Sequence, residues 1–151
     1  MPTLMPERLR RSSQSPTRWV TTEIRVRYAE TDQMGVAYYS NYLVWFEVGR
    51  SEVCRDCGFS YAEMEAKTQA YLAVAEARCR YHSPALYDEV LQIRTAVESL
   101  RKRALNFRYE IVKKNGGALV ATGSTTHIVL DRNGRPKTLP EEYASLLKSS
   151  A

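Results

Sequence analysis

The sequence predicts an α+β fold, with one long helix packed against an antiparallel sheet of about five strands. One strand-like segment precedes a long helical segment, and four strand-like segments follow it, which is an order typical of this class. The chain has 151 residues, of which 44% are hydrophobic, enough for one domain with a buried core. No glycine-rich loop joins a strand to a helix with phosphate-binding spacing, which excludes the Rossmann and P-loop classes.

The first half of the chain is expected to hold the first strand and two helices. Residues 22–28 alternate between apolar and charged side chains, the period of a half-buried strand. Residues 39–57 carry apolar side chains at near-helical spacing and Gly58 provides a stop, so we expect the long central helix there. A shorter helix is expected at residues 61–67.

The second half of the chain is predicted to consist mainly of four strands. Period-two alternation predicts three strands, and the run after the turn residues Asn115-Gly116-Gly117 predicts a fourth. The four segments are residues 75–81, 91–97, 105–111 and 119–130. A turn at Asn133-Gly134 and a short helix at residues 139–147 follow. Because the single long helix covers one face of such a sheet, we expect pairing with a second copy of the chain.

The positive charge is concentrated in the first 20 residues. They contain four arginines and one glutamate, and so carry three of the five net positive charges of the chain. The rest of the chain lacks the basic stripe of a nucleic-acid-binding protein, so no nucleic-acid partner is expected. Residues 1–19 are rich in Arg, Ser and Pro without a hydrophobic stretch. This predicts a basic, disordered tail rather than a signal peptide, a transit peptide or a membrane span. The domain itself is expected at residues 20–148.

The cysteines and histidines do not form a pattern typical of metal sites. Cys54 and Cys57 lie one helical turn apart without a second ligand pair, and Cys79 stands alone. We expect free thiols that pack as small hydrophobic side chains in a reducing cytoplasm. His82 and His127 fall in or beside predicted strands, which favours structural roles.

The segment from Tyr28 to Arg50 carries the strongest chemical signal. It sets Asp32 in a loop with Gly35, just ahead of the expected helix start. The unpaired backbone N–H groups that open a helix attract the negative charge developing on a carbonyl oxygen. Asp32 is therefore a candidate base or nucleophile beside an oxyanion site. The alternative is a carboxylate that only closes an Asx turn or caps the helix.

Residues 30–42, Glu-Thr-Asp-Gln-Met-Gly-Val-Ala-Tyr-Tyr-Ser-Asn-Tyr, resemble the signature of the 4-hydroxybenzoyl-CoA thioesterase-like family. The YbgC-like acyl-CoA thioesterases of bacteria are the nearest-looking branch. The resemblance covers about residues 20–147 and includes Tyr-His-Ser-Pro-Ala-Leu-Tyr-Asp-Glu at residues 81–89. It implies a hot-dog fold, in which a long helix lies in a curled antiparallel sheet and active sites form between two subunits. A homodimer or homotetramer is therefore expected.

The resemblance also implies roles for single residues. Asp32 occupies the position of the family's catalytic aspartate, and Tyr39 the position whose backbone N–H donates to the oxyanion. Many YbgC-like members have histidine there, so a histidine-assisted mechanism is not expected. Arg101, Lys102 and Arg103, here called the basic turn, match a strand connection where some members bind the CoA phosphates through charge-assisted contacts. An ordinary charged turn is the alternative.

Two further carboxylates lie near these residues in the sequence. Glu30 would raise the pKa of Asp32 by like-charge repulsion if both pointed inward, but a solvated loop carboxylate is the simpler expectation. Glu47 lies eight residues beyond Tyr39 on nearly the same helical face. An ion pair between Glu47 and Arg50 is expected there, with the orientation of a water molecule as the alternative.

The leading functional hypothesis is a cytoplasmic acyl-CoA thioesterase. It would hydrolyse the thioester without a metal or separate cofactor, since CoA is part of the substrate. One alternative is a non-catalytic module that binds acyl thioesters. Another is a hydratase or dehydratase, because a fold does not fix a function. The identity of the acyl group, and the choice between CoA and an acyl-carrier protein, are left open by the sequence.

Overall fold

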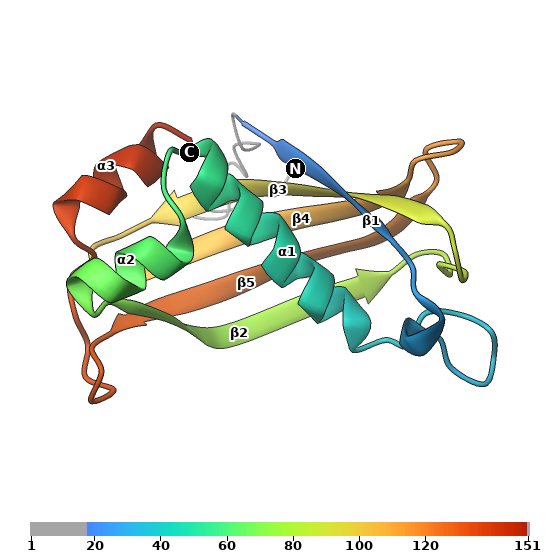
Figure 1. Ribbon diagram of the computed structural model, residues 1–151, viewed down its shortest axis with the longest axis horizontal. Helices are drawn as coiled ribbons and strands as arrows, with labels where there is room; N and C mark the ends of the chain where they lie inside the picture. Colours follow the sequence, from blue (N-terminus) through green and yellow to red (C-terminus); the bar gives the residue numbers. More distant parts are fainter. Residues whose placement is uncertain (1–17, 151) are drawn as a thin grey trace, which may run out of the picture.

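The computed structural model describes residues 18–150, so the predicted tail lies almost wholly outside the described residues. In chain order the elements are β1 (Val20–Arg25), the short 3-10 helix η2 (Tyr28–Glu30), α1 (Asn41–Asp56), α2 (Tyr61–Thr68), β2 (Tyr71–Tyr81), β3 (Val90–Leu100), β4 (Ala104–Lys113), β5 (Leu119–Leu130) and α3 (Glu141–Lys148). The strands form one antiparallel sheet in the order β1-β3-β4-β5-β2. Helix α1 crosses one face of this sheet (Figure 1). The predicted α+β class with five strands is confirmed.

Helix α1 packs closely on the sheet because glycines lie opposite larger side chains. The Phe46 ring stacks on Tyr109 of β4 at a centroid distance of 4.2 Å. A Cβ added to Gly49 would lie 2.2 Å from Thr95 Oγ1, and one added to Gly123 of β5 would lie 2.5 Å from the Phe46 ring. Neither glycine can be replaced without displacing these neighbours, which fixes the middle of α1 over the sheet.

Several predicted boundaries differ from the structure, and β2 begins four residues earlier than expected, at Tyr71. Strand β1 ends at Arg25 rather than at residue 28, because Val26 exchanges hydrogen bonds with Asp88 and Glu89 and the chain then enters η2. Helix α1 begins at Asn41 rather than at residue 39. The preceding residues form a tight turn closed by the Asn41 N–H, which donates to the Tyr38 carbonyl at 3.0 Å.

Strand β2 is a long edge strand. It pairs only with β5 and contains a bulge between Val74 and Glu76. Its residues from Val74 to Arg78 are exposed, so the one-sided burial expected from the alternating sequence is wrong in this stretch. The reason is positional, because α1 packs mainly on β3 and β1 and leaves this edge strand uncovered.

The three cysteines are free thiols, as expected, and Cys54 is buried while Cys57 and Cys79 are half-buried. Burial raises the pKa of the Cys54 thiol to about 12, so this side chain is uncharged at neutral pH. Within residues 18–150, no helix is both long enough and apolar enough to cross a membrane.

Candidate active site

The Asp32 side chain lies in a small hairpin between Thr31 and Ala37, which pair as an antiparallel bridge. Gly35 closes the turn with φ of +79°, a left-handed conformation that glycine adopts without strain. Asp32 Oδ1 accepts a hydrogen bond of 2.8 Å from the Met34 N–H, which is the Asx turn considered above. Oδ2 has no hydrogen-bond partner within residues 18–150. One carboxylate oxygen therefore shapes the loop, and the other is available.

The loop that carries Asp32 packs against residues 81–89, the second segment of the family resemblance. The Ala37 N–H donates to the Ala85 carbonyl at 2.8 Å, and Val36 pairs with Leu86 as an isolated bridge. The two segments enclose a cleft of about 410 Å³, here called the Asp32 cleft. Its walls include a carboxylate, an imidazole and four phenol rings, from Asp32, His82, Tyr38, Tyr39, Tyr42 and Tyr81.

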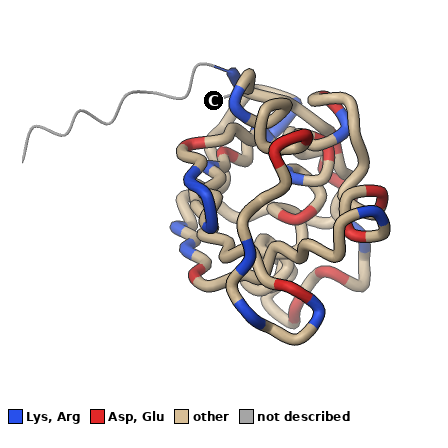
Figure 2. The backbone as a smooth tube through the Cα atoms, turned by 90° about the vertical axis from the view of Figure 1, so that its left-hand side faces the viewer, with Lys and Arg blue, Asp and Glu red and all other residues tan. Residues whose placement is uncertain are grey.

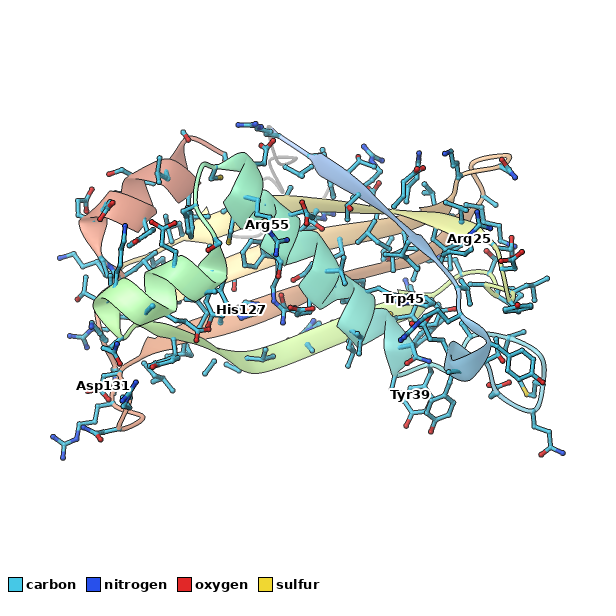
Figure 3. The ribbon with its side chains drawn as sticks, viewed as in Figure 1. Arg25, Tyr39, Trp45, Arg55, His127 and Asp131 are labelled. Carbon is cyan, nitrogen blue, oxygen red and sulfur yellow. The ribbon has the colours of Figure 1, made fainter. Side chains whose placement is uncertain are left out.

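The start of α1 contributes unpaired donors beside this cleft. Ser40 is the N-cap residue, but its side chain makes no capping hydrogen bond. In the part of the chain that the structure describes, neither the Tyr39 N–H nor the Ser40 N–H has an acceptor. Figure 3 shows Tyr39 at this helix start, next to η2. Free N–H groups at a helix N-terminus can stabilise a developing oxyanion.

Glu30 is buried, with 6% of its surface exposed, so the expectation of a solvated loop carboxylate is wrong. Its carboxylate accepts hydrogen bonds from the Trp45 indole N–H at 2.9 Å and from the Arg27 N–H at 2.8 Å. Burial alone would raise the pKa of Glu30, but these hydrogen bonds outweigh it and lower the pKa. The Glu30 carbonyl also accepts from the Asn41 side chain and the Tyr38 N–H, each at 2.8 Å. Glu30 thus ties the loop to the helix start.

The expected ion pair between Glu47 and Arg50 is also wrong. Glu47 accepts a hydrogen bond of 3.3 Å from the Ser51 hydroxyl instead, and no Glu47–Arg50 pair lies within 4.0 Å in the described chain. Arg50 of α1 lines a cavity of about 70 Å³ together with Glu47 and His127. The half-buried Arg50 guanidinium lies near enough to His127 of the sheet to lower the pKa of that imidazole, so it is turned toward the sheet rather than paired with Glu47.

The two histidines lie in different surroundings. His127 is buried, and its Nε2 shares a hydrogen bond of 2.8 Å with Thr125 Oγ1, which in turn bonds the Tyr109 hydroxyl at 2.5 Å. Burial, helped by the nearby charge of Arg50, lowers the pKa of His127 to about 4. This agrees with the structural role expected. His82 lies on the wall of the Asp32 cleft, with Nε2 2.9 Å from Thr122 Oγ1. The sequence feature that could have placed His82 at this cleft is its position directly after Tyr81, within residues 81–89 of the family resemblance.

The basic turn lies far from Asp32 within one chain. It joins β3 to β4, and the Arg103 carbonyl accepts a hydrogen bond of 3.0 Å from the Val129 N–H near the end of β5. Asp131, just beyond that end, lies at the opposite end of the molecule from Tyr39 (Figure 3). Figure 2 looks onto this end, where Lys and Arg segments are interspersed with Asp and Glu segments. The structure therefore brings Asp32 and Tyr39 together but not the basic turn.

Comparison with known proteins identifies the family. The model of the thioesterase-like superfamily matches residues 26–147. The chain belongs to the thioesterase-like superfamily. It is 39% identical over 110 residues to the putative acyl-CoA thioesterase YneP of Bacillus subtilis, covering 73% of this chain and 78% of YneP. It is 30% identical over 125 residues to the acyl-CoA thioester hydrolase YbgC of Escherichia coli O6:H1, covering 83% and 92%.

A solved structure supports the same assignment for this thioesterase-like protein. The DHNA-CoA thioesterase from Staphylococcus aureus superposes with a TM-score of 0.80 at 36% identity, covering 87% of this chain and 91% of that one. The resemblance to the 4-hydroxybenzoyl-CoA thioesterase-like family and the implied hot-dog fold are confirmed.

Proposed function

We propose that this thioesterase-like protein hydrolyses acyl-CoA thioesters in the Asp32 cleft. The observation that carries the proposal is that Asp32 and Tyr39 line one cleft, where Asp32 has a carboxylate oxygen and Tyr39 a backbone N–H without a partner in the described residues. The related proteins named as acyl-CoA thioesterases support the substrate class.

The chemistry follows from these two groups. Asp32 either attacks the thioester carbonyl or takes a proton from the attacking water. Negative charge then develops on the carbonyl oxygen, and the Tyr39 N–H stabilises it at the helix start. The carbon–sulfur bond breaks, and CoA leaves as the thiolate and takes up a proton. If Asp32 acts as the base, the attacking water gives the free acid directly. If Asp32 acts as the nucleophile, the mixed anhydride formed on its carboxylate is then hydrolysed by water, which releases the acid and restores Asp32. The tyrosine rings of the cleft favour an aromatic acyl group, which can stack on them.

The decisive experiment measures release of free thiol from a panel of acyl-CoA esters with aromatic, short aliphatic and long aliphatic acyl groups. We expect turnover on at least one ester, with aromatic esters preferred. Silence on every ester, combined with measurable binding, would favour the non-catalytic module. Hydration of an enoyl-CoA without thiol release would favour the hydratase.

We further propose that the basic turn binds the CoA phosphates. Its three side chains are exposed at the β3–β4 connection and suit a polyphosphate. Replacing Arg101 and Arg103 by Ala should raise the KM for acyl-CoA by about tenfold, the scale of one lost charge-assisted contact. The corresponding N-acetylcysteamine thioester, which lacks the nucleotide, is the control and should be unaffected. Equal damage with both substrates would assign the turn to the fold instead.

We also propose that the protein is a homodimer or a dimer of dimers, built on the exposed edge of β2. An apolar groove of about 350 Å³ runs between α1 and this edge, lined mainly by Leu43, Val44, Val74 and Ala77. An 11-residue edge strand beside exposed apolar side chains suits antiparallel pairing with its own copy. Such pairing about a twofold axis would set the Asp32 end of one copy beside the basic-turn end of the other. Light scattering should return twice or four times the chain mass of 17.3 kDa.

A further inference from the structure

Tyr81 links the edge strand to the start of α1. It is the last residue of β2, in register with Ala121 of β5. Its hydroxyl donates a hydrogen bond of 2.8 Å to the Tyr39 carbonyl. The Tyr81 ring also packs edge-to-face with the ring of the buried Tyr42 of α1, at a centroid distance of 4.8 Å and an interplanar angle of 90°. Ring and hydroxyl therefore contact different parts of the same helix start.

The hydrogen bond acts on the backbone that the chemistry uses. The residues just before α1 form a turn rather than helix, so regular helical hydrogen bonds do not hold their peptide groups. The Tyr39 N–H and carbonyl belong to one residue, and a bond that fixes the carbonyl restricts the ψ angle of Tyr39. The same carbonyl forms a planar trans peptide with the Ser40 N–H, so its orientation also sets that donor. A hydrogen bond to the Tyr39 carbonyl polarises this peptide group and strengthens the Ser40 N–H as a donor.

We infer that Tyr81 is a positioning residue, whose hydroxyl holds the Tyr39–Ser40 backbone in place so that its N–H groups meet the oxyanion without reorganisation. This inference rests on the proposed function. Donors that are fixed before the reaction lower the barrier more than donors that must first be ordered. Tyr81 itself need not touch the reacting atoms for this effect.

The environment keeps the Tyr81 hydroxyl in its donating form. Although Tyr81 is 47% exposed, partial desolvation of its hydroxyl, with Cys79 beside it, raises the pKa of Tyr81 to about 12. The phenol therefore stays neutral over the working range of an enzyme, and its loss should scale the rate without moving the pH profile. A proton-transfer role would instead remove one limb of that profile.

The test is Tyr81→Phe, which keeps the ring against Tyr42 and removes only the hydroxyl. Tyr71→Phe is the matched control, because Tyr71 opens the same strand and its hydroxyl, 3.4 Å from Gln69 Oε1, lies at the other end of the sheet. We expect kcat to fall about tenfold in Tyr81→Phe, the scale of one hydrogen bond, with KM and the shape of the kcat pH profile unchanged. Tyr71→Phe should match wild type.

A second measurement does not depend on turnover. Amide ¹⁵N relaxation should show lower order parameters at Tyr39 and Ser40 in Tyr81→Phe, and no change in Tyr71→Phe. Unchanged order parameters at both amides would overturn the inference, even if wild type hydrolysed no ester and the proposed function failed. With an active enzyme, a kcat within twofold of wild type would overturn it, as would a raised KM at constant kcat, which would mean that Tyr81 binds the substrate directly.

Discussion

At the scale of single residues, Asp32 divides its carboxylate between two tasks. Oδ1 closes the loop by accepting the Met34 N–H, while Oδ2 has no hydrogen-bond partner within residues 18–150 and Asp32 lines the cleft. The two readings of Asp32, as an Asx-turn residue and as a catalytic carboxylate, are therefore compatible. A substitution that preserves the turn acceptor separates them.

Asp32→Asn should lower kcat by about two to four orders of magnitude, the usual scale for losing a positioned base or nucleophile. The amide oxygen of Asn can still accept the Met34 N–H, so the melting temperature should stay close to that of wild type. Steady-state thiol release and thermal unfolding measure the two effects. A folded Asn variant with more than a tenth of wild-type turnover would make Asp32 a turn residue only.

Tyr39→Phe should retain most activity, because the proposed role of Tyr39 belongs to its backbone N–H and the substitution leaves that donor in place. The side chain is 61% exposed and packs on the Tyr38 ring, a contact that Phe can also make. Tyr39→His should behave similarly. If Tyr39→Phe lost as much kcat as Asp32→Asn in a folded protein, the phenol hydroxyl would belong to the mechanism.

His127 should make the folded state sensitive to acid. Its folded pKa of about 4 lies below the ordinary value of 6.5, so the unfolded chain takes up the proton first as pH falls. The contribution of His127 is fully present above pH 6.5 and is lost progressively between pH 6.5 and 4, by at most about 3 kcal/mol. Urea unfolding at pH 7 and pH 4.5 should show this loss in wild type and a smaller one in His127→Gln. An identical pH dependence in both proteins would contradict the buried neutral imidazole.

At the scale of elements, the loop and the helix start are held together from inside. The Glu30 carboxylate bonds the Trp45 indole of α1, and the Glu30 carbonyl bonds the Asn41 side chain at the first turn. These hydrogen bonds hold the loop that carries Asp32 in a fixed position relative to the start of α1, where the Tyr39 and Ser40 N–H groups lie. Tyr81 adds a third attachment from β2.

Glu30→Ala should lower the free energy of unfolding by about 1–3 kcal/mol, because it leaves the buried indole N–H of Trp45 without an acceptor and removes the part-buried hydrogen bond from the Arg27 N–H. It should also lower kcat at temperatures where the protein stays folded, since the loop loses its anchor. Glu23→Ala is the control, because Glu23 makes only exposed contacts with Lys114 and Gln92, and its loss should leave stability nearly unchanged. Equal effects of the two substitutions would deny Glu30 its anchoring role.

At the scale of the whole molecule, the chain leaves a long edge and an apolar groove on one side of its sheet. The other edge, β1, has only six residues. Because the Asp32 cleft and the basic turn lie at opposite ends of one chain, the proposed grip on CoA depends on a second copy. Assembly and activity should therefore be lost together.

Val74→Lys places a charge in the apolar groove, where dimer formation would have to strip it of water. We expect a shift toward the monomer in light scattering and a raised KM for acyl-CoA, with both effects reduced at high protein concentration. Leu119→Lys, at another exposed apolar position outside this groove, should remain assembled and active. A Val74→Lys monomer with wild-type kcat and KM would contradict a shared site.

The sequence by itself determined the fold class, the order of the elements and the loop that carries Asp32. These depend on periodicity and on turn residues such as Gly35 and Gly58, which act over a few neighbouring positions. It also placed Asp32 and Tyr39 near each other, because only six residues separate them in the chain. Tertiary structure decided that Glu30 is buried, that Arg50 is directed toward His127 of the sheet, and that Tyr81 and His82 reach the cleft. These outcomes depend on contacts between residues distant in the chain, such as Tyr81 with Tyr39. A local sequence pattern does not indicate which distant residue will contact a given side chain in the folded protein.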